Sequence, residues 1–257
     1  MHLSFGRRQF SPSPAFTLLM LALCVIFIAL GRWQWRRGTF RAAEHARFER
    51  GAREVVALGS APLTQIPDYQ RVSLTGTYDA AHQFLLDNMT YHDVDGYQVL
   101  TPLVRPGGDV VLVNRGWVPF LGTRSNLPDV SIKTAAAVTV TGRVGDLPTA
   151  GLASGRAPAP AKGPWPRVTG FPTLAQLSGV LGRPLDPHIL LLDPHEPDGY
   201  VRDWRLAGIP PMQNFAYAFE WWCFAIAALV MWVMLSSKRE AQRPAESDRR
   251  PSNGVSR

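Results

Sequence analysis

The sequence predicts a membrane-anchored α+β protein, in which N- and C-terminal transmembrane helices flank an antiparallel, barrel-like β domain with one or two helices. Three observations lead to this fold class. Apolar runs lie near both ends of the chain, the residues between them alternate between apolar and polar with a period of two, and one helical pattern follows late in that middle part. A length of 257 residues suits one medium domain plus such additional segments.

The first apolar run covers residues 15–30 and contains no charged residue. Trp33 and the arginines around it resemble an interfacial belt, so we predict a transmembrane helix over residues 15–33. A cleaved signal peptide is the alternative, but bulky residues follow the run where small residues would precede a cleavage site. The charged segment 41–53 is expected to continue the helix out of the membrane.

The second apolar run, residues 215–235, is interrupted only by Glu220 and predicts a second transmembrane helix. The polar residues 236–257 that follow are expected to be disordered. Basic residues follow this run closely and place the C-terminus in the cytoplasm by the positive-inside rule. Residues 1–14 then form a cytoplasmic tail as well, and residues 34–212 form an extracytoplasmic, periplasmic domain.

The first span gives the opposite topological signal, because four arginines follow it while Arg7 and Arg8 precede it. These later arginines are therefore expected to have a task other than setting the topology. Net charge is +7, but the basic residues collect beside apolar runs and lack the aromatic interleaving of an RNA-binding surface. We expect no nucleic-acid partner.

Short strands and turns occupy the middle of the chain. One strand is expected to break at Gly76, a hairpin to turn at residues 106–108, and residues 148–167 to form a loop. Thr173 is positioned to cap a helix over residues 174–181, which Gly182 would end. The segments expected to contain the strands are 69–79, 82–89, 96–120 (two strands), 136–145 and 188–192.

Catalytic and metal-binding patterns are weak. The sequence lacks nucleophile-elbow, zincin, phosphate-loop and Rossmann motifs, which disfavours an enzyme and, in particular, a membrane-tethered hydrolase. The histidines of the middle part lack the i, i+4 spacing of a helical metal site, and His92 with Asp93 and Asp95 is more typical of a turn than of a metal site. These histidines are His45, His82, His92, His188 and His195.

Two cysteines, Cys24 and Cys223, each lie alone in an apolar run. Their isolation excludes a disulfide framework and a CxxC site, and we expect both to be small buried side chains.

A periplasmic sensor is a further alternative for the function of the chain, but the sequence offers no cytoplasmic output domain for it.

Several strings are more specific. "LGRWQWRR" (30–37), "GYQVLTPL" (96–103), "VVLVNRGWVP" (110–119), "LLLDPHEPDGYVRDW" (190–204) and "YAFEWW" (217–222) together resemble the surfeit locus protein 1 family, the Shy-type assembly factors of cytochrome c oxidase. The resemblance runs from one end of the chain to the other.

The resemblance implies a non-enzymatic chaperone in respiratory chain biogenesis, which handles haem a for insertion into the large subunit of a haem-copper terminal oxidase. Its partners would be the membrane, that subunit and other assembly factors. The short segment before the first span leaves no room for a mitochondrial transit peptide, which favours a bacterial inner membrane. Residues matching the family motifs, as candidates for haem or partner binding, are Gly31, Trp33, Gln34, Arg37, Asn114, Arg115, Gly116, Trp117, Tyr217 and Trp221.

Structural alternatives stay open for these motifs. Trp33 and Arg37, four residues apart, share a helical face and can serve as an interfacial anchor alone. Gln34 beside them would suit a contact with a partner subunit or with haem propionates. Gly116 can simply belong to a β-bulge, whereas Arg115 is the candidate group for binding a partner's carboxylate.

The sequence departs from the family at one important position. Family members commonly carry a histidine, the proposed haem ligand, three residues before the Tyr-Ala pair of the second helix, and here Asn214 stands there. Haem would then need a remote ligand such as Met212, or a ligand from the partner, or is not bound. The alternative function is an interaction-only membrane scaffold that stabilises an oxidase subunit without binding haem.

Glu220 has no explanation in the family pattern. An ionisable residue within a membrane span is costly and therefore suggests a function. Our hypothesis is that Glu220 pairs with Arg32 or Arg36 of the first helix and fixes the two helices together. The alternative is a glutamate that reaches the membrane interface alone.

Overall fold

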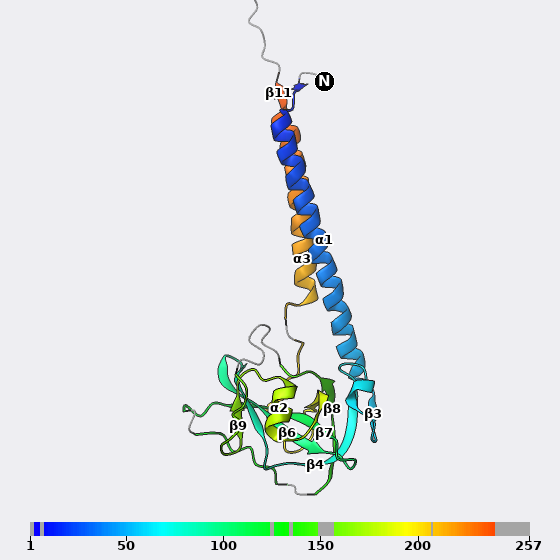
Figure 1. Ribbon diagram of the computed structural model, residues 1–257. Coiled ribbons are helices and arrows are strands. Elements are labelled where there is room, and N and C mark those ends of the chain that lie inside the picture. The colour runs from blue at the N-terminus through cyan, green and yellow to red at the C-terminus, as the bar shows by residue number, and fades with distance from the viewer. Residues whose placement is uncertain are drawn as a thin grey trace, which may run out of the picture. The chain divides into compact units, whose positions relative to one another are not determined.

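The computed structural model describes residues 3–5, 8–123, 126–133, 136–148, 157–206 and 208–239. The chain divides into two compact units, one made of residues 1–42 with 209–257 and the other of residues 43–208 (Figure 1). Most of the predicted disordered tail 236–257, parts of the predicted tail 1–14 and residues 149–156 of the expected loop lie outside the described residues.

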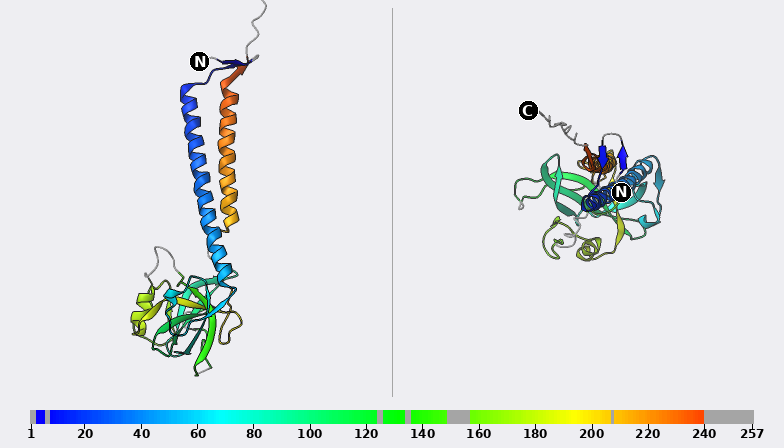
Figure 2. Two further views of the ribbon diagram at one scale, coloured as in Figure 1. Left: turned by 90° about the vertical axis from the view of Figure 1, so that its right-hand side faces the viewer. Right: turned by 90° about the horizontal axis from the view of Figure 1, so that it is seen from above.

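The first unit is built on two helices, α1 (Pro14–Gly51) and α3 (Pro211–Ser236). They lie side by side and run in opposite directions, as Figures 1 and 2 both show. Among the described residues, these two helices are long and apolar enough to cross a membrane. The charged segment after the first span does continue α1, as predicted. The second helix begins at Pro211 rather than Phe215, because proline is favoured in the first helical turn.

A small antiparallel sheet adds to this unit. It contains β1 (Leu3–Phe5), β2 (Arg8–Phe10) and β11 (Ser237–Arg239), in the order β1-β2-β11. Phe10 packs edge-on against Trp232, with 5.3 Å between the ring centroids. The two antiparallel helices bring residues 8–10 and 237–239 together, so short segments that carry no strand pattern of their own can pair there.

The seam between α1 and α3 follows a repeat of three and four residues on both helices. Cys24 donates to the carbonyl oxygen of Ala225 (3.6 Å), and Phe27 stacks on Trp221 with ring centroids 5.8 Å apart. This repeat is the pattern of antiparallel helices that pack in a left-handed pair. The residues forming the seam are Met20, Cys24, Phe27, Gly31 and Gly38 on α1, and Asn214, Ala218, Trp221, Ala225 and Ala228 on α3.

A five-stranded barrel forms the second unit. Strands β4, β8, β10, β7 and β6 are neighbours in this order, and pairing between β4 and β6 closes the ring. The barrel strands are β4 (Arg71–Tyr78), β6 (Val94–Val104), β7 (Val110–Pro119), β8 (Val138–Gly145) and β10 (Leu185–Leu192). The remaining strands, β3 (Val55–Ala57), β5 (Phe84–Tyr91) and β9 (Arg167–Thr169), extend the sheet beyond the ring. The predicted fold class is confirmed.

Among the described strands most pairs are antiparallel, but three are parallel: β3 with β4, β10 with β7, and β5 with β9. Parallel pairing requires a crossover rather than a tight turn. Between β7 and β10 the chain passes through β8, β9 and the helix α2 (Leu174–Leu181), which supplies such a crossover.

Local turn and cap chemistry agrees with the sequence. The β6–β7 hairpin turns at residues 105–109, and Gly108 has φ 88°. Thr173 forms a capping box with Gln176, and Gly182 ends α2 in the left-handed conformation with φ 71°. These short-range predictions are confirmed because each rests on a backbone angle or an unpaired amide that only a few residue types accommodate.

Gly76 does not break its strand, contrary to the prediction. The pairing of β4 with β8 ends at Gly76, and the next residue, Thr77, pairs with Val104 of β6. A Cβ at Gly76 would lie 2.7 Å from the carbonyl oxygen of Val104. The glycine therefore marks the corner where β4 changes partners and the barrel closes.

Apolar side chains fill both faces of the central strands. On β7, Val111 and Val113 point into the barrel core, whereas Leu112 belongs to the cluster under α2 with Leu177 and Ile189. The strand is therefore buried on both sides, which explains its almost continuous apolar sequence. The short strands β3 and β9 and the 3₁₀ turn Leu63–Gln65 were not predicted, because three residues carry no readable periodicity.

Candidate functional site

The string Asn114–Trp117 forms a β-bulge on β7. Gln98 of β6 lies opposite Trp117 and Leu100 lies opposite Asn114, so two steps along β6 match three along β7. Gly116 has φ 107°, a conformation that favours glycine. The bulge expected at this glycine is confirmed, and it turns the Arg115 side chain into the interior of the domain.

Arg115 is the largest fully buried side chain of the described residues, with 1% of its surface exposed. Its Nη1 donates to Gln83 Oε1 (2.8 Å) and to the carbonyl oxygen of Val130 (2.9 Å). Its Nε donates to the carbonyl oxygen of Asp198 (2.6 Å). In the part of the chain that the structure describes, no carboxylate forms an ion pair with this guanidinium. Neutral oxygens instead satisfy it, as a buried charge requires.

Burial also sets the electrostatics around Arg115. Desolvation lowers the pKa of its guanidinium, while the nearby Tyr200 and Tyr78 act in the opposite direction. The guanidinium lies over the Tyr200 ring, 5.0 Å from the centroid. Desolvation raises the pKa of Tyr78 to about 12, and the charge of Arg115 only partly offsets that rise. At neutral pH the charged Arg115 therefore lies beside two neutral phenols, those of Tyr78 and Tyr200.

The segment Asp198–Trp204 lies directly on the bulge. Tyr200 donates its backbone N–H to the carbonyl oxygen of Arg115 (2.7 Å), and Trp117 and Val201 exchange two backbone hydrogen bonds (2.8 and 3.1 Å). A Cβ at Gly116 would lie 2.5 Å from the carbonyl oxygen of Val201. Two strings that are far apart in the sequence and carry the family resemblance thus meet here.

Arg202 fastens this segment. Its Nη1 donates to the carbonyl oxygens of Asp193 (2.6 Å) and Glu196 (2.8 Å), and its Nη2 donates to that of Pro194 (2.7 Å). The sequence analysis missed Arg202, Tyr200 and Gln83 as members of this cluster. The first two lie inside a quoted family string, which was a usable signal, but nothing in the sequence marked Gln83.

Asn114 and Trp117 also make internal contacts. Asn114 donates to Gln98 Oε1 (2.8 Å) and accepts from the backbone N–H of Gly116 (3.1 Å). The indole N–H of Trp117 donates to the carbonyl oxygen of Met89 (2.8 Å). These contacts give the whole Asn-Arg-Gly-Trp string a role in holding the barrel together, with the Trp117 ring alone partly exposed.

The four predicted residues of α1 divide between two faces of the helix. Gly31 packs against the indole of Trp222 in the seam, and Gln34 is half-buried on the same side. Trp33 and Arg37 lie on an exposed face, where the guanidinium carbon of Arg37 is 5.7 Å from the centroid of the Trp33 ring. The predicted sharing of a face by Trp33 and Arg37 is confirmed.

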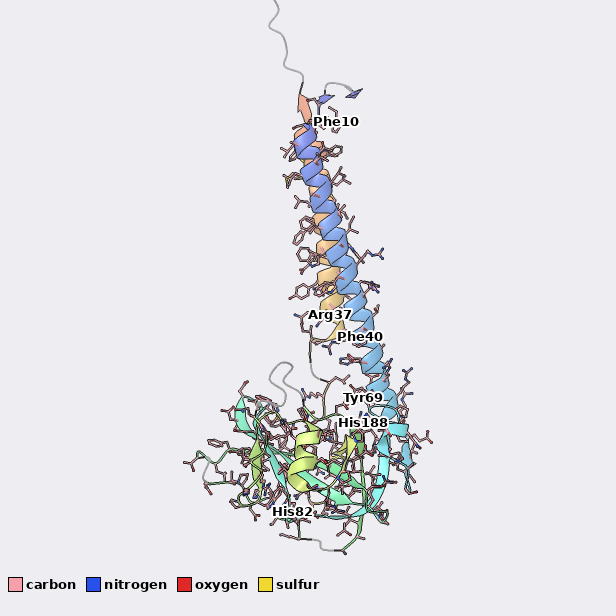
Figure 3. All side chains as sticks on the ribbon, viewed as in Figure 1. Phe10, Arg37, Phe40, Tyr69, His82 and His188 are labelled. Carbon is pink, nitrogen blue, oxygen red and sulfur yellow. The ribbon has the colours of Figure 1, made fainter. Side chains whose placement is uncertain are left out.

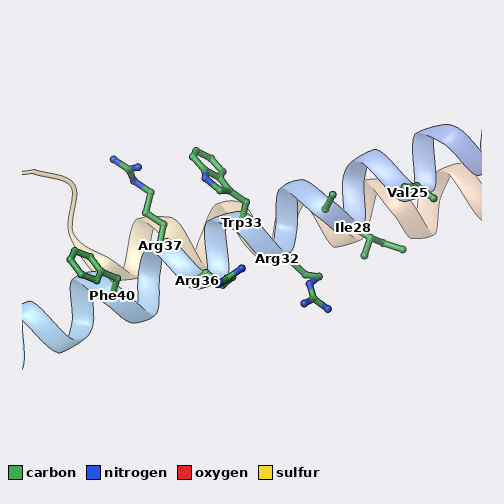
Figure 4. A pocket seen from close by; sticks show the side chains of 8 residues that line it. Val25, Ile28, Arg32, Trp33, Arg36, Arg37 and Phe40 are labelled. Atoms are coloured by element: carbon green, nitrogen blue, oxygen red, sulfur yellow. The ribbon is translucent and has the colours of Figure 1, made fainter.

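An open groove of about 660 Å³ runs along that exposed face of α1. Arg32, Trp33, Arg36 and Arg37 line one end, with Phe40 beyond them (Figure 4). Val25, Ile28 and Ala29 line the other end within the apolar run. The groove therefore combines a cationic end and an apolar end.

Asn214 lies in the seam of the helix pair. Its side chain is 3% exposed, and its Nδ2 has no hydrogen-bond partner among the described residues. Trp221, one of the two other predicted residues of α3, also lies in the seam, whereas Tyr217 is 40% exposed and its hydroxyl accepts from Gln213 Nε2 (3.4 Å). Asn214 therefore lies in the seam with α1, and it is not among the residues that line the groove on α1 described above.

Glu220 does not pair with Arg32 or Arg36, contrary to our hypothesis. The side chain is exposed, and the described residues include no ion pair between it and either arginine. Gly31 contacts Trp222 and Gly38 contacts Phe215, so Glu220 is close to the level of Arg32. However, adjacent residues on a helix point in directions about 100° apart. Glu220 directly precedes Trp221 of the seam, so its side chain points away from the seam.

Cys223 is also exposed, so the expectation that it would be buried is wrong, whereas Cys24 is partly buried in the seam. An outward position on a membrane helix can be apolar without being covered by protein, because lipid takes the place of the core. Met212, the remote-ligand candidate, is 74% exposed at the start of α3.

The histidines do not converge. His82 and His188 are well separated in Figure 3, and no group of three potential metal ligands occurs among the described residues. His82 pairs with Asp79 (2.8 Å), and His188 lies 3.9 Å from both Asp68 and Asp146. His92 and Asp93 have φ of 48° and 62°, which is turn geometry as expected. No contact between His188 and His195 is recorded in the part of the chain described.

A closed β-barrel domain and an antiparallel pair of apolar helices define the chain as a membrane-associated barrel protein. The model of the SURF1 family matches residues 21–226. Uncharacterized SURF1-like proteins of Mycobacterium bovis and of two strains of Mycobacterium tuberculosis are 29% identical over 226 residues, covering 82% of this chain and 80% of each relative. The chain belongs to the SURF1 family. This membership supports a general role in cytochrome oxidase assembly.

Proposed function

We propose that the chain is a non-enzymatic, interaction-only scaffold in the assembly of a haem-copper terminal oxidase. It binds the large subunit and holds it during biogenesis, without acting as the haem a carrier. Family membership supports the assembly role, and one observation supports the scaffold over the carrier. Asn214 stands where the family resemblance implies a haem-ligating histidine, and its side chain lies in the seam between α1 and α3.

Haem a does not fit the residues found at this place. An iron ligand must be a nitrogen, sulfur or oxygen donor that can reach the metal, and haem proteins use histidine, cysteine, methionine or tyrosine for this purpose. The Asn214 amide is a poor donor, and its 3% exposure leaves no room for a porphyrin beside it. Met212 is exposed and is not among the residues that line the groove on α1. The proposed scaffold therefore acts without binding haem a itself.

The cationic groove on α1 is the feature that favours haem a carriage as a second candidate function. Haem a is amphiphilic, and its propionates would suit arginines at the edge of a membrane span. The groove is lined by apolar and arginine residues with Trp33, and none of its lining residues is an axial ligand. Carriage through this groove would need the iron ligand to come from the partner.

The proposed location is a bacterial inner membrane, with α1 and α3 spanning it and both termini in the cytoplasm. The barrel then lies in the periplasm, and assembly takes place beside the membrane on that side. Apolar helices and family membership support membrane association. The orientation rests on the basic residues after α3.

Affinity purification from two strains tests the scaffold. The tagged chain is isolated from cells that make haem a and from cells in which haem a synthesis is blocked, and the oxidase large subunit is quantified in both eluates. Another two-span membrane protein with the same tag serves as the control. The scaffold predicts equal recovery of the large subunit, after correction for its abundance in the membrane. Recovery that requires haem a would contradict it.

A further inference from the structure

Three arginines of α1, Arg32, Arg36 and Arg37, line one end of the groove, and Figure 4 shows Arg37 extending on the side of Trp33 while Arg32 extends to the other side. Across the described residues, the structure records no hydrogen bond or ion pair from the guanidinium groups of Arg32 and Arg36. The contact recorded for Arg37 is the stacking on Trp33 at 5.7 Å. Glu220, at a similar level on α3, lies on a different face and leaves these charges uncompensated.

The cluster is also placed where an amphiphile would need it. Val25, Ile28 and Ala29 extend the groove into the uncharged run of α1, and the arginines begin where that run ends. A ligand lying along the groove would have its apolar part at membrane depth and its anionic part at the interface. Trp33 at the boundary is typical of side chains at the headgroup level.

We propose that this groove binds one anionic phospholipid, with the headgroup phosphate at Arg32 and Arg36, which are one helical turn apart, Arg37 beside them, and an acyl chain along Val25, Ile28 and Ala29. Guanidinium groups bind phosphate oxygens with charge-assisted, bidentate hydrogen bonds. Basic sites beside membrane helices attract anionic lipids on the same grounds. The open shape of the groove suits a lipid that enters sideways from the bilayer.

This occupant also accounts for the conflicting topology signal. If the arginines after the first span bind lipid phosphate on the barrel side of the membrane, their position is explained by the ligand. They then do not indicate which side is cytoplasmic under the positive-inside rule. The basic residues after α3 can then set the orientation alone. The lipid site is independent of the oxidase scaffold, and either can fail without the other.

Lipid preference of the full-length chain tests the proposal. The protein is reconstituted in phosphatidylcholine bilayers with spin-labelled phosphatidylglycerol or spin-labelled phosphatidylcholine, and the motionally restricted fraction of each probe is measured. We expect wild-type protein to prefer phosphatidylglycerol by about fivefold or more. The triple variant Arg32→Gln, Arg36→Gln, Arg37→Gln should lose that preference. Equal preference in these two proteins would overturn the proposal.

A matched control separates the groove from net charge. The variant Arg47→Gln, Arg50→Gln, Arg53→Gln removes three exposed arginines from the last turns of α1 and the residues after it. It should keep the wild-type preference. A loss as large as that of the groove variant would show a general charge effect and overturn the site.

Two further experiments test whether an acyl chain occupies the groove and whether the bound phosphate belongs to a lipid. Ala29→Phe fills the apolar end of the groove while keeping all three arginines, so it should lower the preference for phosphatidylglycerol. Millimolar inorganic phosphate should not displace the lipid. Full preference in Ala29→Phe, or displacement by inorganic phosphate, would contradict an acyl chain in the groove. Circular dichroism of each variant verifies that the helices and the barrel are intact.

Discussion

Gly31 of α1 lies directly against the indole ring of Trp222 on α3, so that a Cβ at position 31 would overlap the ring. Further along α1, a Cβ at Gly38 would lie 2.7 Å from the Phe215 ring. Small residues let the two helices approach closely at the positions where the opposite helix is bulkiest. The glycine of the "LGRWQWRR" string is therefore explained by the seam of the helix pair.

Replacing Gly31 with leucine should separate the helices. Cys24 lies against Ala225 in the seam (3.6 Å from sulfur to the carbonyl oxygen), so an Ala225→Cys variant in a Cys223→Ser background offers a cross-linking pair. We expect oxidant to join Cys24 to the introduced thiol readily in this background and several-fold more slowly after Gly31→Leu. Ala22→Leu, on an exposed position of α1, is the control and should not change the rate. An unchanged rate after Gly31→Leu would show that close approach at this glycine does not hold the helices together.

Gly116→Ala should destabilise the barrel more than Gly108→Ala does. Both glycines have a positive φ, 107° and 88°, so each substitution carries the strain of the left-handed region, about 1–2 kcal/mol. Only Gly116 has a close neighbour, the carbonyl oxygen of Val201 at 2.5 Å from a built Cβ, whereas nothing lies within 4 Å at Gly108. Thermal unfolding of the two variants in the same detergent measures the difference. Equal melting temperatures would show that the contact with Val201 is not constraining.

Arg115→Met should lower the free energy of unfolding by at least about 2 kcal/mol. The substitution removes the hydrogen bonds that the charged guanidinium donates to Gln83, Val130 and Asp198, and hydrogen bonds to charged groups contribute about 1.5–3 kcal/mol each. Near-ultraviolet circular dichroism during denaturant unfolding provides the measurement. Arg205→Gln, at an exposed arginine that pairs with Asp203, is the matched control and should stay within about 0.5 kcal/mol. An unchanged free energy of unfolding in Arg115→Met would show that the hydrogen bonds of Arg115 do not stabilise the barrel.

Tyr78→Phe should change how stability depends on alkaline pH. Burial raises the pKa of Tyr78 to about 12, above its ordinary value of 10.0, so the folded state holds the proton more tightly than the unfolded state. Below about pH 10 this pKa difference costs the folded state nothing. As the pH rises towards 12, the phenol ionises in the unfolded state first, and the free energy of unfolding falls by about 2–3 kcal/mol. The variant should lack this part of the decline, which denaturant unfolding at a series of pH values measures. At pH 7 the change should be small, because the hydroxyl has no partner among the described residues.

Local signals in the sequence were enough for much of the fold. Thr173, Gly182 and the glycine turn at residues 106–108 mark backbone conformations that few residues adopt, so the helix α2 and the β6–β7 hairpin were predictable. The prediction at Gly76 was wrong because this glycine lies where β4 changes partners and the barrel closes, rather than at the end of a strand. That closure depends on β6, which pairs with β4 from a later part of the sequence. No local pattern contains such a contact.

The candidate site was predictable only in part as a set of residues, and it was not predictable as an arrangement. The bulge at Gly116 followed from the sequence, whereas the seat of Tyr200 on Arg115 depends on a segment far along the chain. Glu220 and the arginines of α1 were marked as unusual from the sequence. Which of them meet depends on helix rotation, and a single residue of offset turned Glu220 away from the seam.

Asn214 decides between the two functions most directly, because it occupies the position of the expected haem ligand and is buried against α1. The decisive measurement is the visible spectrum of the full-length chain, purified in mild detergent from cells that make haem a, together with its haem content per chain. The scaffold predicts a colourless protein, in which any residual haem signal matches the amount of co-purified oxidase large subunit. A stoichiometric haem a band in chain that is free of the oxidase subunit would contradict it.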